Sequence, residues 1–319
     1  MKQVVSFATA GLATLCLAIS VQATKPTVWN EISVEALRQV DDDIGRNIGK
    51  QDFFGGVKIS EYRFSENGFD WHLIRFVNAE NPDGPLWMVP HDDENAAFDG
   101  MIAAVSQYGG VGIAVNSGPG SARLQSGHGI CGVRNTETAN CDPNRNFDAK
   151  TPLFTSAFLA QRTAYQPVIA LHTNSRGFSG DGEGGRGEIT ILDIAAFQRG
   201  EYSPRNGGVL AINPRAEMAN ADTLGLTAYL AREGKPDESK TRCGQGIAND
   251  GVHFWHERVT KSDGSMSNYL ALNHPDIAYF NAESRNEADL AVAASRHGIM
   301  ISAYLKNCGA SGNKPTPRP

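Results

Sequence analysis

Apolar and polar residues alternate with two different periodicities along most of this chain of 319 residues. Short apolar runs typical of strands, several of them apolar on both faces, lie at residues 71–77, 85–89, 112–115, 167–171, 208–212 and 277–280. Longer segments with the spacing of amphipathic helices lie at residues 95–105, 223–233 and 286–304. Strands that are apolar on both faces suit a sheet that helices cover on two sides. We therefore predict an α/β fold, a single three-layer α/β/α sandwich around a mixed, mostly parallel β-sheet.

The two ends of the chain differ from the part between them. One cation, Lys2, precedes an apolar run over residues 4–21, no acidic residue interrupts it, and small residues follow. This pattern predicts a secretory signal peptide at residues 1–23 and therefore a periplasmic or secreted protein. Residues 24–313 are then expected to form one folded domain, and the proline-rich residues 314–319 are expected to be a disordered tail. No other stretch approaches the ~20 apolar residues that span a bilayer, so we expect no stable membrane insertion after signal cleavage.

Composition narrows the class of protein. With 40% hydrophobic and 20% charged residues, the chain can bury a large core. Its 29 Lys and Arg residues against 35 Asp and Glu residues give a net charge of −6, which argues against a nucleic-acid-binding protein. Four of the five cysteines lie beyond the predicted signal peptide, and export favours two disulfides. Three pairings are open; we favour Cys131 with Cys141, which bracket a short loop, and Cys243 with Cys308.

Two long loops interrupt the alternation of strands and helices. Residues 116–146 are rich in glycine and polar residues, and residues 175–187 read SRGFSGDGEGGRG. Long loops inside a compact domain usually carry function. The second loop is either a substrate lid, in which glycines supply positive φ, or a solvated surface loop.

Histidine and carboxylate side chains follow two of the predicted strands. His91 and Glu94 come directly after residues 85–89, and His172 follows residues 167–171. Strand ends open onto a common cleft in α/β sheets, so these side chains are expected to meet. Two histidines, one carboxylate and an open position make a catalytic zinc site. The sequence therefore predicts one Zn²⁺ per chain, bound by His91, Glu94 and His172.

The order of three motifs resembles a known family. HxxE at His91, DxNRNF at Asp142 and a histidine at a strand end, in that order, are similar to the zinc carboxypeptidases of the carboxypeptidase A type. The family's glutamate base sits near the C-terminus in an (F/Y)xxE context, and Phe280 to Glu283 has that form. The resemblance covers residues 91–283 and is nearest to the small bacterial members.

The resemblance implies a role for each of these residues. Glu283 is the general base and then the general acid, in preference to Glu287, which lies in a helix-like stretch. Arg145, with Asn144 beside it, binds the free C-terminal carboxylate of a peptide substrate through two parallel hydrogen bonds. A second arginine stabilises the oxyanion, and Arg134 is favoured over Arg123 for this role.

A second cluster of candidate ligands lies in DGVHFWHE, residues 250–257. His253 and Glu257 fit one face of a helix, but on a strand His253 and His256 would lie on opposite faces. We assign this segment to the structure or to the substrate pocket rather than to a second metal site.

The predicted function is hydrolysis of a C-terminal peptide bond. In the expected compartment, the stem peptides of peptidoglycan are the leading substrate and other exported peptides the next. One alternative is a zinc-dependent amidohydrolase or deacylase of the aspartoacylase type, which shares the HxxE and histidine pattern. Another is a peptide-binding protein of the same fold that has lost catalysis. The presence of Glu283 favours an enzyme over the latter, while stereospecificity and oligomeric state stay open.

Overall fold

The computed structural model describes residues 28–117, 141–163, 165–174, 209–211, 223–230 and 238–309. Several predicted features lie outside these ranges: the signal peptide, Cys131, Arg134, Arg123, the loop at residues 175–187 and the tail. The described residues form ten strands in one sheet. The strands are β1 (Asn30–Glu31), β2 (Val57–Glu66), β3 (Phe69–Asn78), β4 (Leu86–Val89), β5 (Val111–Asn116), β6 (Val168–Asn174), β7 (Val209–Ala211), β8 (Thr223–Leu230), β9 (His253–Val259) and β10 (Tyr279–Arg285).

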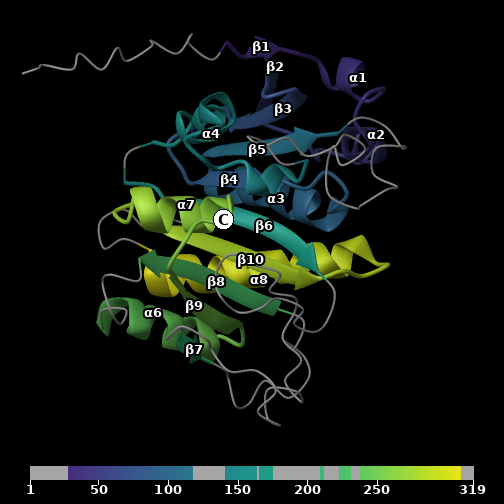
Figure 1. Cartoon of the computed structure of the whole chain (residues 1–319). Helices are drawn as coiled ribbons and strands as arrows, with labels where there is room; N and C mark the ends of the chain where they lie inside the picture. Colours follow the sequence, from purple (N-terminus) through teal and green to yellow (C-terminus); the bar gives the residue numbers. More distant parts are fainter. Residues whose placement is uncertain are drawn as a thin grey trace, which may run out of the picture.

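The order of strands across the sheet is β1-β2-β3-β5-β4-β6-β10-β8-β9-β7. Figure 1 shows them stacked from β1 at the top to β7 at the bottom. The four strands β5, β4, β6 and β10 are parallel to one another. The prediction of a mostly parallel sheet is nevertheless wrong, because five of the nine neighbouring pairs of described strands are antiparallel. One of them is the β2–β3 hairpin, which turns at Asn67 and Gly68 with φ of 54° and 86°.

Helices cover both faces of the sheet, which confirms the α/β class. They are α1 (Val34–Leu37), α2 (Asp42–Asn47), α3 (Asn95–Tyr108), α4 (Pro152–Leu159), α6 (Glu238–Asn249), α7 (Met266–Asn273) and α8 (Leu290–Cys308). On one face, side chains of α2, α3, α6 and α8 share a core with Trp87, Leu171 and Phe280. On the other face, α4 and α7 share a second core with Met88, Ala170 and Leu224. No helix in the described ranges has both the length and the apolar character needed to cross a membrane.

Most of the predicted elements are observed, with one clear exception. Residues 223–233 were expected to be helical, but Thr223–Leu230 is strand β8, between β10 and β9. Leu224 and Leu226 point to one core, and Tyr229, on the opposite parity, is also buried. Because both faces of β8 are covered, its apolar residues fit a helical period as well as a strand period.

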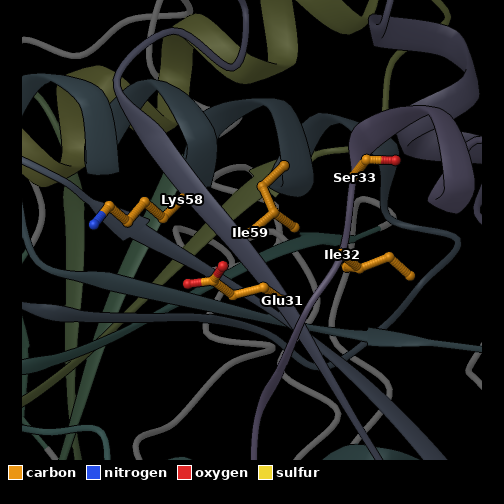
Figure 2. Close-up of a pocket in the computed structure, with 5 residues that line it drawn as sticks. All are labelled: Glu31, Ile32, Ser33, Lys58 and Ile59. Atoms are coloured by element: carbon orange, nitrogen blue, oxygen red, sulfur yellow. The ribbon is translucent and has the colours of Figure 1, made fainter.

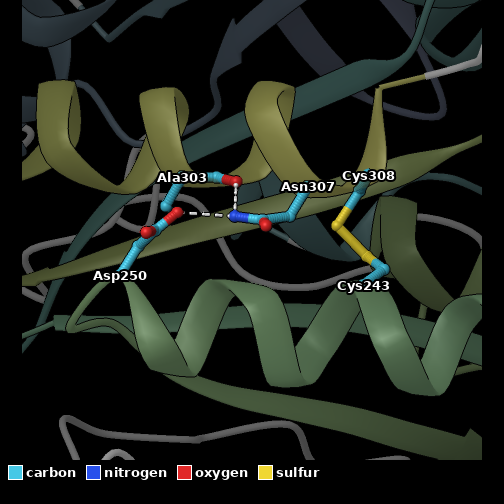
Figure 3. The surroundings of a disulfide bond; sticks show 5 residues. All are labelled: Cys243, Asp250, Ala303, Asn307 and Cys308. Atoms are coloured by element: carbon cyan, nitrogen blue, oxygen red, sulfur yellow. Dashed lines mark hydrogen bonds between the residues drawn. A yellow bond between two sulfur atoms is a disulfide. The ribbon is translucent and has the colours of Figure 1, made fainter.

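The predicted pairing of Cys243 with Cys308 is confirmed, and it joins α6 to α8 (Figure 3). The bond closes a sequence separation of 65 residues, which restricts the unfolded chain. Beside it, Asp250 accepts hydrogen bonds from Lys306 and Asn307 at 2.7 and 2.6 Å. Asp250, one of the acids of the DGVHFWHE segment, therefore links the end of α6 to α8 by hydrogen bonds.

His253 makes the stability of the fold depend on pH. Its side chain is fully buried on β9, and neither ring nitrogen has a hydrogen-bond partner among the described residues. Burial lowers the pKa of His253 from 6.5 to about 4. Between these two pH values the unfolded chain binds more protons at this position than the folded protein. Burial of the neutral His253 imidazole therefore does not reduce the free energy of unfolding above pH 6.5. It reduces this free energy progressively as the pH falls towards 4.

We predict that the stability difference between the wild type and His253→Gln shrinks by up to ~3 kcal/mol from pH 6.5 to pH 4. Urea denaturation of both metal-free proteins across this range measures it. If the difference in free energy of unfolding between the two proteins does not change with pH, the lowered pKa of His253 is contradicted.

Candidate metal centre

The three predicted ligands come from two neighbouring strands. His91 and Glu94 lie in the short turn between β4 and α3, and His172 lies near the end of β6. β4 and β6 are adjacent and parallel, so their carboxyl ends open at the same edge of the sheet. Glu94 occupies the N-cap position of α3 but makes no capping hydrogen bond. Its carboxylate turns towards the histidines instead, near the helix N-terminus, where negative charge is favoured.

The ligand atoms of His91, Glu94 and His172 lie within 4.8 Å of one another, and all three residues are buried. His91 Nδ1 is 2.7 Å from Glu94 Oε1, and His172 Nδ1 is 3.2 Å from both His91 Nδ1 and Glu94 Oε2. Zn–N and Zn–O bonds of ~2.0–2.1 Å at tetrahedral angles require ligand separations of ~3.3 Å. The spacing and the donor set of two imidazoles and one carboxylate therefore fit a zinc ion.

Without a cation, this cluster depends on mutual ion pairing. Burial alone would lower the pKa of His91, but the carboxylates of Glu94 and Asp142 raise it to about 10. Burial opposes ionisation of Glu94 as well, yet the two histidines hold its pKa well below the usual range. His91 and Glu94 therefore stabilise each other's charged form inside a buried site.

Three contacts orient the ligands. Asp142 Oδ1 is 2.9 Å from His91 Nε2, so it fixes the ring with Nδ1 directed at the other ligands. The backbone N–H of Thr173 donates to Glu94 Oε2 at 2.9 Å. His297, on α8, donates from Nε2 to the carbonyl oxygen of His172 at 2.8 Å. Sequence reasoning did not assign these orienting roles, because each one joins residues that lie far apart in the sequence.

Glu283 lies directly beside His172. In the parallel pairing of β10 with β6, these two residues are register partners and share a face of the sheet. Asn281 donates to Glu283 Oε1 at 2.8 Å, while the buried Oε2 has no partner among the described residues. Burial raises the pKa of Glu283, and Glu94 adds to this, while His172 and Asn281 oppose it. Glu287, the other candidate base, instead pairs with Arg296 at 3.0 Å outside this face.

Arg145 and Asn144 lie in a single 3-10 turn, η2 (Pro143–Arg145), which Asp142 caps. Arg145 donates to the Asn144 carbonyl at 3.0 Å, and its Nε is 3.8 Å from Asp263. Gly264 packs directly against the backbone of Arg145. It has a φ of +84°, and a Cβ at this position would lie 2.4 Å from the Arg145 carbonyl oxygen, so this close contact requires glycine. Phe147 then anchors the far end of the loop against Phe154 and Phe158.

A separate hollow of about 500 Å³ lies between β1 and β2, at the edge of the sheet (Figure 2). It is lined by Glu31, Ile32, Ser33, Lys58 and Ile59. Three strands, β3, β5 and β4, separate β2 from β6, so this hollow is not part of the metal centre.

No protein-family model matches this chain, and no curated protein matches it. Several solved structures resemble this chain at TM-scores below 0.4. A provisionally named metallopeptidase from Shewanella denitrificans OS217 is 12% identical, with a TM-score of 0.38, covering 90% of this chain and 98% of its own. Csd4, a cell shape determinant protein from Helicobacter pylori with a bound tripeptide, is 16% identical, with a TM-score of 0.37, covering 74% and 55%. A provisionally named carboxypeptidase from Burkholderia mallei ATCC 23344 is 13% identical, with a TM-score of 0.39, covering 82% and 66%. At these values the likeness is weak, and the roles given to residues below rest on the geometry of this chain.

Removing the carboxylate of Asp142 should weaken metal binding. We predict that Asp142→Ala lowers the affinity for Zn²⁺ by about 10- to 100-fold, because His91 loses the contact that orients its ring. Competition with a chromophoric chelator measures the affinity. Asp148→Ala is the matched control, since Asp148 belongs to the same loop and its carboxylate accepts from the Lys150 N–H. Equal affinities of the two variants would contradict the orienting role.

Proposed function

We propose that this protein is a zinc-dependent metallocarboxypeptidase that hydrolyses the C-terminal peptide bond of exported peptides. One observation carries the proposal: His91, Glu94 and His172 converge in a buried cluster, and Glu283 is the register partner of His172. A metal-binding group and an adjacent buried carboxylate are the two elements that metal-assisted hydrolysis needs.

Zinc held by these ligands would polarise the scissile carbonyl and acidify the attacking water. Glu283 is placed to receive a proton from that water on its unpartnered Oε2. It then passes the proton to the nitrogen of the leaving amine as the C–N bond breaks. Asn281 fixes the other oxygen and thereby the orientation of the carboxylate.

Arg145 provides the recognition of a free C-terminus. One of its nitrogens is engaged by the Asn144 carbonyl, and the distance of 3.8 Å to Asp263 is too long for a hydrogen bond. The remaining N–H groups can take a substrate carboxylate in the bidentate geometry that guanidinium favours. Arg134 stays our candidate for stabilising the oxyanion.

Peptidoglycan stem peptides are the substrate we favour, with other exported peptides next. The disulfide between Cys243 and Cys308 supports maturation in an oxidising compartment, which agrees with the predicted signal peptide. A periplasmic or secreted enzyme meets these peptides.

Glu283→Gln should abolish hydrolysis without loss of metal. We predict a fall in kcat of about 10²- to 10⁴-fold with unchanged zinc content, because the amide cannot accept the proton. Release of the C-terminal amino acid from muropeptides and ordinary peptides gives the rate, and elemental analysis gives the metal. Glu287→Gln, which alters the acid paired with Arg296, should keep full activity. Full activity of Glu283→Gln would refute the mechanism, and cleavage of N-acyl amino acids alone would favour the deacylase alternative.

The role of Arg145 predicts a requirement for a free carboxylate. Arg145→Lys should raise KM for peptides with a free C-terminus by about 30-fold or more, since a lysine cannot form the bidentate contact. Wild-type protein should discriminate against C-terminally amidated peptides by a similar factor. Steady-state kinetics on matched acid and amide peptides measure both effects. Equal rates of cleavage of the acid and amide peptides by the wild type would show that Arg145 does not bind the C-terminal carboxylate.

A further inference from the structure

The residue at the N-cap position of α3 is also a candidate metal ligand. An N-cap side chain ordinarily accepts hydrogen bonds from the backbone N–H groups that the first turn of a helix leaves unpaired. In the described part of the chain, the carboxylate of Glu94 makes no such bond, because it faces His91 and His172 instead. A helix end without a side-chain cap frays more readily, and fraying here would displace Glu94. The position of this ligand therefore depends on what else holds the first turn of α3.

Arg46, in the last turn of α2, holds this turn from outside. Its Nη2 donates to the carbonyl oxygen of Asn95, the first residue of α3, at 3.2 Å. Its Nη1 donates at 2.8 Å to Asp99, one turn further along α3. Nη2 also donates to Asp43 at 2.6 Å, which ties the guanidinium back to its own helix. Asn47 adds a second hydrogen bond to Asp99 at 2.8 Å, so α2 contacts two consecutive turns of α3.

The helix that carries Arg46 is itself fixed to the sheet. Asp41 caps α2 by accepting from the Ile44 N–H at 2.8 Å, and it also accepts from the side chain of Asn116 at 3.0 Å. Asn116 ends β5, which pairs with β4 on the side away from β6. Ile44 is fully buried in the core that α2 shares with α3 and α8. Arg46 therefore projects from an anchored helix towards the turn that carries Glu94.

The geometry of this contact suits a guanidinium. Asp43 and Asp99 are 2% and 9% exposed, and two buried carboxylates require a counter-charge. Lys50 comes within 3.6 Å of Asp99, but from an exposed position. The planar fork of Arg46 reaches both acids and the Asn95 carbonyl oxygen at once, whereas a lysine offers a single ammonium. Arg46→Lys therefore keeps the charge and loses the three-way contact.

We propose that Arg46 is a positioning residue of the metal centre, which holds the first turn of α3 and thereby keeps the Glu94 carboxylate beside the two histidines. The proposal rests on the proposed function in so far as this centre is to bind zinc. Arg46 acts through the backbone at Asn95 and through Asp99. The affinity for metal thus depends on a contact between α2 and the turn that carries the ligands.

The first test measures zinc affinity. Competition of Zn²⁺ with a chromophoric chelator at pH 7 compares the wild type with Arg46→Lys and Asp99→Asn, each of which should bind about tenfold more weakly. Because both changes break the same contact, the double variant should lose no more than about threefold beyond either single variant. Arg63→Lys is the matched control, since Arg63 pairs with Glu61 on β2 and its replacement should leave the affinity unchanged.

Amide hydrogen exchange of the metal-free proteins gives a second readout. The Thr173 N–H donates to Glu94 Oε2 at 2.9 Å, so its exchange rate reports whether the carboxylate is in place. We expect this amide to exchange about tenfold faster in Arg46→Lys and in Asp99→Asn. The Val168 N–H, which donates to the Ala278 carbonyl oxygen at the other end of β6, should keep its rate. A general loss of stability would accelerate both amides.

Equal zinc affinity of the wild type and both single variants would overturn the positioning role while leaving the metal centre intact. An unchanged rate at Thr173, or equal acceleration at Thr173 and Val168, would overturn it as well. Asp99→Asn tests the same contact if Arg46→Lys does not fold. If the wild type binds no zinc, the proposed function fails, and the exchange rates alone then decide whether Arg46 holds the Glu94 carboxylate in place.

Discussion

The parallel pairing of β6 with β10 is the constraint on which the candidate site depends. It makes His172 and Glu283 register partners, 111 positions apart in the chain, so that a metal ligand and a carboxylate share one face at one level of the sheet. Adjacent β4 delivers His91 and Glu94 to the same edge. Backbone hydrogen bonds of the sheet, rather than flexible side-chain contacts, therefore set the spacing between the candidate ligands and Glu283, and the proposed function depends on that spacing.

The cluster also explains why so many polar groups can be buried at the end of these strands. An isolated buried carboxylate or imidazolium would be strongly destabilising, but Glu94 is in contact with two histidines and a backbone N–H. Asp142 and His297 extend the network to a loop and to α8. A metal ion bound by these residues would displace the proton that His91 shares with Glu94 and Asp142, so metal binding would depend on pH.

The clustering of the three candidate ligands could be predicted from the sequence because each follows a short apolar run, which marks both the strand and its end. The same signal failed at β8, where Leu224, Leu226 and Tyr229 are buried on opposite faces and fit two periods at once. It also failed for β2 and β9, because polar residues interrupt the apolar runs of these two strands. The orienting roles of Asp142 and His297 could not be predicted, since they depend on which distant backbone or ring comes within hydrogen-bond distance.

Both faces of the sheet carry buried polar atoms that have no hydrogen-bond partner among the described residues. On the face of α2, α3, α6 and α8, these atoms include Asn47 Oδ1 and His297 Nδ1, beside a large apolar core, a disulfide and the Asp250 contacts. On the opposite face, the buried polar atoms without partners among the described residues include nitrogens of His253 and oxygens of Asn281 and Glu283. Unsatisfied groups at these positions lower stability, and natural proteins keep such groups where a ligand completes them. Among these residues, Glu283 is the register partner of the candidate ligand His172, so its unpartnered oxygen is the one that the proposed mechanism uses.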